Sequence, residues 1–200
     1  MDVRNQIDQF IADGWHCRNY TFAFRQAYIW GTLIALPFAA LACGGYRVFL
    51  MNRAVLLDHG KLILLAVIVV SHPLHELLHG LGWKLAGRLE NYEIKYLFQH
   101  GIPMCSCLTV LSAKAYITGV LLPFLVLGGG SIVFLIVYPN TISVLAALVN
   151  QLLSGADLLI SWKILRSGAV KIAYNQDQAG FIGLFPPKAL DWRLSKGQVK

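Results

Sequence analysis

The sequence predicts an α-helical multipass membrane protein with about four transmembrane helices and a small β-hairpin inserted between spans two and three. Of its 200 residues, 56% are hydrophobic and 14% are charged, against about 25% charged in a typical soluble domain. The apolar residues gather in runs of about 20 residues, the length a helix needs to cross a hydrocarbon core of about 30 Å. The runs cover residues 27–46, 62–83, 115–138 and 141–162.

The segment before the first run does not have the pattern of a signal peptide. Residues 1–26 carry three aspartates and three arginines, so the first run is expected to stay in the protein as a span. Pro37 and Pro73 fall inside the first two runs, which membrane helices tolerate when neighbouring groups satisfy the freed carbonyls. In the third run, Gly128-Gly129-Gly130 predicts a kink or close helix packing.

Two segments outside the runs predict hairpins. Residues 92–96 partly alternate between polar and apolar side chains, and His100-Gly101 can turn the chain back through residues 104–109. Residues 169–174 and 181–185 give a weaker signal within the C-terminal tail, residues 163–200. No disulfide framework is expected in a chain of this size. The pair of cysteines at 105 and 107 is therefore interpreted as two reduced thiols rather than metal ligands.

The net charge of +7 indicates membrane topology rather than nucleic-acid binding. The basic residues lie between apolar runs and form no stripe or nucleic-acid motif, so they are expected to set orientation and to contact anionic headgroups. They are frequent in the N-terminal segment, in the loop after the second run and in the tail, whereas the Pro139-Asn140 turn has none. This distribution predicts that both termini are cytoplasmic. The loop with Arg47, Arg53 and Lys61 is an exception, because this orientation would place its basic residues on the opposite side of the membrane.

Only two acidic residues, Glu76 and Asp157, lie well inside an apolar run. A charge at mid-membrane costs about 2.5–3.5 kcal/mol on insertion scales, so such residues indicate a functional site. Glu76 belongs to the H-E-x-x-H motif that runs from His75 to His79. On a helix this spacing places both imidazoles on one face, where they can bind one Zn²⁺. The glutamate between them can then act as general base toward a metal-activated water.

A catalytic zinc needs a third protein ligand. The metzincin spacing would require a histidine where this chain has Leu85, and Glu90 and Glu93 lie beyond the lipid-embedded helix. Asp157 is the better candidate. The second and fourth runs are expected to cross the membrane in the same direction, so their C-terminal ends lie on the same side. At 1.5 Å per residue, the motif lies roughly 10 Å from that end of the second run, and Asp157 lies roughly 9 Å from that end of the fourth.

Other polar residues could serve the same site. A polar stripe lies at helical spacing along the fourth run: Asn150, Ser154, Asp157 and Ser161. Its serines and Asn150 either form interhelical hydrogen bonds or contact substrate and oxyanion, and Asn150 is the strongest candidate for the second role. His72 precedes His75 by one helical turn. It could orient a ligand, stabilise an oxyanion or have no chemical role.

The His-Glu-Leu-Leu-His helix, with Asn150 and Gly155-Ala156-Asp157 in the last run, resembles the site-2 protease group of intramembrane metalloproteases. Over most of its length, the chain is more similar still to a bacterial membrane family called putative zincin peptidases. The similar segments include the loop to Cys105-Ser106-Cys107, the helix start at residues 116–123 and the tail at residues 177–181.

The resemblance implies a zinc peptidase with His75, His79 and Asp157 as ligands and Glu76 as base. Site-2 proteases carry prolines after the asparagine and a glycine after the aspartate, and both are missing here.

The function expected from these observations is hydrolysis of peptide bonds in membrane or membrane-associated proteins, with Zn²⁺ as cofactor. The whole chain is expected to form one membrane-embedded zincin-like domain in the bacterial inner membrane. Its partners would be the lipid bilayer and a protein or peptide substrate, which could add a strand to the 92–109 hairpin. The sequence does not predict the oligomeric state. The alternative is a non-catalytic metal-binding membrane protein, such as a transporter or an inactive scaffold, which gives Glu76 no particular role.

Overall fold

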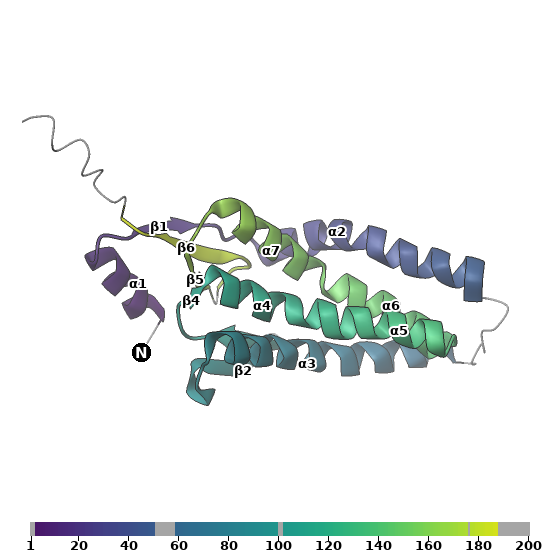
Figure 1. Cartoon of the computed structure of the whole chain (residues 1–200). Coiled ribbons are helices and arrows are strands. Elements are labelled where there is room, and N and C mark those ends of the chain that lie inside the picture. The colour runs from purple at the N-terminus through teal and green to yellow at the C-terminus, as the bar shows by residue number, and fades with distance from the viewer. Residues whose placement is uncertain (1–2, 51–58, 100–101, 176, 188–200) are drawn as a thin grey trace, which may run out of the picture.

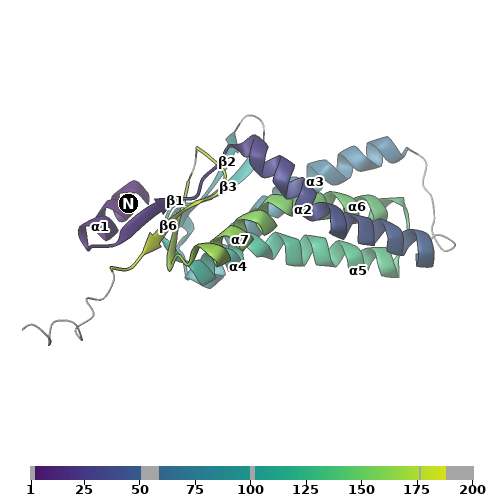
Figure 2. The same ribbon diagram turned by 90° about the horizontal axis from the view of Figure 1, so that it is seen from above.

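Long apolar helices lie side by side, with a small β-sheet at one end of them (Figure 1). The computed structural model describes residues 3–50, 59–99, 102–175 and 177–187. Seen from above, the short helix α1 (Val3–Ala12) and the sheet lie at the end opposite α5 (Gly129–Val137) (Figure 2). The position of the sheet matters because the candidate site described below lies in the half of the helices that is nearer to the sheet.

The structure contains helices long and apolar enough to cross a membrane, at all four predicted runs. They cover Phe24–Val48, Gly60–Gly87, Ala113–Val137 and Thr141–Ser167. Most of them extend several residues beyond the apolar runs. Large apolar side chains cover their outer faces, including Leu41, which is 74% exposed, and Leu62, which is 65% exposed. Such surfaces are compatible with a lipid surrounding.

The first two candidate spans, called spans below, are α2 (Phe24–Gly45), which continues into the π-helix η1 (Tyr46–Leu50), and α3 (Gly60–Gly87). The third span consists of α4 (Ala113–Pro123), the π-helix η4 (Phe124–Gly128) and α5. The irregularity begins directly after Pro123, which has no N–H to donate. The Gly128 carbonyl accepts hydrogen bonds from Ser131 Oγ at 2.8 Å and Gln151 Nε2 at 3.2 Å. The π-helical segment ends at the first of the three glycines, so a kink at this position stays a prediction. Close packing is not found at Gly129 and Gly130, where an added Cβ would meet nothing within 4 Å.

The fourth span is broken at Ser154 into α6 (Thr141–Leu153) and α7 (Gly155–Ser167). Ser154 has a ψ of −1°, and its Oγ donates to the Asn150 carbonyl at 3.0 Å. A serine bonded back to the preceding turn commonly bends a membrane helix. The break places Asp157 in the first turn of α7.

Both predicted hairpins are present. After the short helix η3 (Asn91–Glu93), β2 (Ile94–Gln99) pairs antiparallel with β3 (Ile102–Cys107). β5 (Lys171–Tyr174) pairs antiparallel with β6 (Phe181–Phe185).

The second hairpin belongs to a four-stranded sheet that the sequence did not predict. Its strand order is β1-β6-β5-β4, with β1 (His16–Asn19) on one edge and β4 (Leu111–Ser112) on the other. Part of the expected tail, residues 163–200, is therefore built into the fold. α7 continues to Ser167, and two strands follow it.

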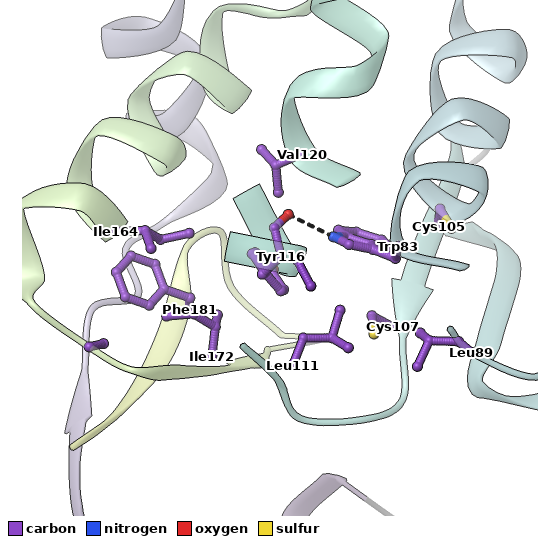
Figure 3. Packing of buried hydrophobic residues seen from close by; sticks show 12 residues of the cluster. Trp83, Leu89, Cys105, Cys107, Leu111, Tyr116, Val120, Ile164, Ile172 and Phe181 are labelled. Carbon is purple, nitrogen blue, oxygen red and sulfur yellow. Dashed lines mark hydrogen bonds between the residues drawn. The ribbon is translucent and has the colours of Figure 1, made fainter. Parts of the chain in front are cut away.

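A buried cluster joins the sheet to the helix ends (Figure 3). Trp83 of α3 and Tyr116 of α4 pack together, and the Trp83 indole N–H donates to the Tyr116 carbonyl at 3.0 Å. Ile164 of α7 is also buried in this cluster, as are Ile172 and Phe181 from the sheet. Burying side chains of this size stabilises the fold by about 1.5–3 kcal/mol each. The cluster therefore fixes the ends of α3, α4 and α7 relative to one another.

Candidate metal centre

The structure brings His75, His79 and Asp157 together. His75 Nε2 lies 3.0 Å from Asp157 Oδ2, and His79 Nε2 lies 3.4 Å from Asp157 Oδ1. The two Nε2 atoms are 3.1 Å apart. All three residues are buried, with exposed fractions of 5% for His75, 7% for His79 and 8% for Asp157. The depth argument from the sequence therefore placed Asp157 beside the correct turn of α3.

The distances fit a tetrahedral metal. Zinc binds imidazole nitrogen and carboxylate oxygen at about 2.0–2.2 Å, so tetrahedral ligand atoms lie about 3.3 Å from one another. One ligand atom from each residue lies within 4.8 Å of the other two, and the closest pairs are at 3.0–3.4 Å. Two imidazoles and one carboxylate are also the donor types that zinc prefers.

A hydrogen bond sets the tautomer of His79. Its Nδ1 lies 3.1 Å from the Gly119 carbonyl of α4, and only a protonated nitrogen can donate to a carbonyl. In the neutral ring, Nε2 then carries the lone pair that faces His75 and Asp157. A cation between these residues would accept that lone pair, and the residues present therefore fit a zinc ion.

Two glycines allow α7 to approach α2 closely beside Asp157. A Cβ added to Gly31 would lie 2.5 Å from the Ala156 nitrogen, and one added to Gly155 would lie 2.2 Å from the Gly31 carbonyl oxygen. Only hydrogen in place of Cβ permits this backbone contact. The first span thus helps to place the aspartate.

Glu76 and His72 contact the edge of β3 from α3. The Cys105 backbone N–H donates to Glu76 Oε2 at 2.7 Å, and His72 Nε2 lies 3.2 Å from the Pro103 carbonyl, to which it donates. Glu76 is half-buried, so its carboxylate is oriented by the strand. A peptide strand that pairs with this edge, as the sequence suggested, has to displace these two contacts.

The candidate metal site opens into a cavity of about 470 Å³. Five of the predicted site residues line it: His72, His75, Glu76, His79 and Asp157. Asn150 and Ser154 are buried, and neither is among the lining residues. The Asn150 amide donates to the Ala146 carbonyl at 2.9 Å, and the Ser154 hydroxyl donates to the Asn150 carbonyl. Both side chains therefore hydrogen-bond within their own span rather than to the cavity.

Residues of the predicted tail also line the cavity. Tyr174 of β5 and Asp177 of the following loop contribute to its wall. Burial raises the pKa of the Tyr174 phenol. The sequence analysis placed this region outside the site, because two short strands do not indicate which helices they contact. The weak hairpin signal and the similarity of residues 177–181 to the family were the signals available.

The cysteines of β3 are free and buried. Burial, and secondly the charge of Glu76, raise the pKa of the Cys105 thiol to about 12. Burial raises that of Cys107 to about 11. Metals bind the thiolate rather than the thiol. These values agree with the interpretation of both residues as reduced, protonated thiols.

Comparison with known proteins identifies the family. A family model described as "putative zincin peptidase" matches residues 68–170, more than half of the chain. No curated protein and no solved structure matched. The matched region contains the H-E-x-x-H helix and Asp157, the residues that the structure gathers around the candidate metal site. The chain therefore belongs to the family of putative zincin peptidases.

Proposed function

We propose that this protein is a zinc-dependent metallopeptidase that cleaves membrane or membrane-associated proteins, as site-2 proteases do. The observation that carries the proposal is the meeting of three metal-binding side chains from two spans, with a glutamate carboxylate lining the same cavity. His75, His79 and Asp157 would hold the ion, and Asp157 would offset part of its charge. Zinc, when bound, acts as a Lewis acid that polarises a carbonyl and acidifies water.

Glu76 would perform the proton transfers. Its carboxylate takes a proton from the attacking water and returns it to the leaving amine, so the glutamate is ionised again after each cycle. The Cys105 N–H holds Oε2 at 2.7 Å, which leaves the other oxygen, Oε1, for the proton. His72 is turned to the Pro103 carbonyl and has to leave this contact before it can stabilise an oxyanion.

The setting supports a membrane substrate. The site lies between helices that are long and apolar enough to span a bilayer, and apolar side chains such as Val120, Leu153 and Ile160 line much of its cavity. We propose that the protein lies in the bacterial inner membrane with both termini in the cytoplasm. A substrate segment would reach the cavity in extended form, because a helix shields its own peptide bonds.

The test is Glu76→Gln. Glutamine keeps an acceptor for the Cys105 N–H but cannot take a proton, so peptide cleavage should fall by at least about 100-fold while zinc content stays near one ion per chain. Purified protein is assayed by mass spectrometry of peptide products and by elemental analysis. Glu90→Gln is the matched control, because Glu90 is exposed and caps η3. Cleavage that survives Glu76→Gln refutes the proposed base. Zinc binding without any cleavage by the unmodified protein favours the non-catalytic alternative.

A further inference from the structure

The cavity contains a carboxylate that the proposed chemistry does not use. Asp177 lies in the loop between β5 and β6 and lines the same cavity as the metal centre. Its side chain is exposed. The close contacts between acidic and basic side chains found among the described residues join Asp157 to the two histidines, and none involves Asp177. Its charge is therefore available to a molecule that enters the cavity.

The loop is held in place on both sides. Asn175 Oδ1 accepts hydrogen bonds from the backbone N–H groups of Asp177 at 2.8 Å and Gln178 at 3.0 Å. The Phe22 N–H donates to the Ala179 carbonyl at 2.9 Å, joining the loop to the segment before α2. These hydrogen bonds restrain the backbone at Asp177 and Gln178, which limits the entropy lost when the Asp177 carboxylate binds a partner.

The charges that line the cavity have one sign. The chain has 17 lysines and arginines against 10 acidic residues. Nevertheless, Glu76, Asp157 and Asp177 are the charged lining residues within the described ranges, apart from histidines. Lys163 of α7 lies near this loop, but its Nζ is turned onto the Phe22 ring, 4.0 Å from the centroid. A bound zinc ion would be offset by Asp157 and Glu76, which leaves Asp177 uncompensated.

Aromatic side chains also line this cavity, among them Phe24 and Tyr28 of α2 and Tyr174 of β5. Aromatic faces attract ammonium and guanidinium groups through the ring quadrupole, and an adjacent carboxylate adds a direct ionic attraction. A cavity lined by aromatic rings and an uncompensated carboxylate can therefore hold an organic cation better than a neutral or an anionic group.

We propose that Asp177 is a specificity-determining residue that selects peptides carrying an organic cation near the bond to be cleaved. The cation is the side chain of a lysine or arginine, or a free amino terminus. This inference rests on the proposed function, since it assigns a substrate class to the same site. Asp177 contacts the substrate away from the reacting atoms and has no part in the proton transfers.

The test measures peptide binding in the full-length, zinc-loaded protein in detergent, with Glu76→Gln present to prevent turnover. Otherwise identical peptides carry lysine, norleucine or glutamate at the central position, an uncharged fluorophore, and either an acetylated or a free amino terminus. Fluorescence anisotropy gives each Kd. An exposed ion pair contributes about 0.2–1 kcal/mol, so a cationic peptide should bind roughly 1.5- to 5-fold more tightly than its neutral counterpart. The difference should shrink at high salt.

Substitutions at Asp177 separate the outcomes. Asp177→Asn should remove the preference for the cation, and Asp177→Lys should reverse it in favour of glutamate. Asp8→Asn is the matched control, because Asp8 is exposed on α1 and does not line the cavity. Preference among acetylated peptides identifies a side-chain cation, and preference confined to free amines identifies the amino terminus. Equal binding of charged and neutral peptides, no binding of either, or a preference that survives Asp177→Asn overturns the inference.

Hydrolysis by the unmodified protein is scored separately. A cation preference that depends on Asp177 in a protein that never cleaves peptides would refute the proposed peptidase function and leave the cation site standing. Cleavage of peptides without any charge preference would refute the cation site and leave the proposed peptidase function standing. Zinc content should be the same in every Asp177 variant.

Discussion

Replacing Gly31 with alanine tests how the helices build the metal centre. Gly31 lies in α2, outside the region matched by the family model, and contacts no proposed ligand directly. The added Cβ would lie 2.5 Å from the Ala156 nitrogen and 2.8 Å from the Gly155 carbonyl carbon, whereas ordinary contacts begin near 3.4 Å. The backbones of α2 and α7 therefore have to separate by about 1 Å. Overpacking of this kind costs about 1–3 kcal/mol.

The displacement should reach the proposed ligand. Asp157 directly follows Ala156, and a metal site tolerates errors of about 0.2 Å in its ligand distances. We expect Gly31→Ala to weaken zinc binding by about 10- to 100-fold, the range seen when residues that orient metal ligands are changed. Competition with a chromophoric chelator gives the affinity. The visible spectrum of the Co²⁺-substituted protein reports the coordination geometry, which a loss of stability alone would not change.

Gly44→Ala is the control within the same helix. A Cβ at Gly44 meets nothing within 4 Å, so this variant gains helix propensity, up to about 1 kcal/mol, without a clash. It should bind zinc normally. A folded Gly31→Ala protein with unchanged zinc affinity and an unchanged Co²⁺ spectrum would show that the α2–α7 contact does not position Asp157, and the reasoning would be wrong.

Two further predictions concern the proposed ligand and the thiols. Asp157→Ala should weaken zinc binding by more than about 100-fold, because it removes a ligand rather than its support; zinc content near one ion per chain in this variant would exclude the carboxylate as third ligand. The raised pKa of the Cys105 thiol, about 12 against 9.0 for an ordinary cysteine, means that it stays protonated at pH 9, where an unfolded chain would already ionise. Iodoacetamide, which reacts with the thiolate, should then label exposed Cys17 before Cys105, and mass spectrometry after timed labelling checks the order.

The features that depend on local composition could be predicted from the sequence. The spans follow from runs of apolar residues, because length and hydropathy alone decide whether a helix can cross a bilayer. The placement of Asp157 beside the motif followed from a constant rise per residue along two helices that run in the same direction. It succeeded because the break at Ser154 precedes Asp157, so the stretch from Asp157 to the polar end of the span is regular helix.

The features that the sequence did not predict depend on contacts between distant segments. Asn150 and Ser154 were candidates for substrate contact because a continuous helix would place them on the face of Asp157. In the structure their side chains hydrogen-bond within the span, and neither residue lines the cavity. The four-stranded sheet pairs strands from both ends of the chain, with His16 opposite Phe185. Strands this short carry too weak a pattern for their partners to be identified.

The contacts between distant segments show that the H-E-x-x-H motif and Asp157 form only part of the site. Residues 68–170 contain His75, Glu76, His79 and Asp157, but the wall of the cavity is completed by residues on either side of that region. α2 contributes Phe24 and the backbone contact at Gly31, and the segment after β5 contributes Asp177. In the proposed arrangement, metal binding and proton transfer would depend on the matched region, whereas the position of Asp157 and the choice of substrate would depend on segments outside it. Gly31→Ala should therefore alter zinc affinity, and substitutions at Asp177 should alter peptide preference, without removing any group that takes part in the proposed reaction.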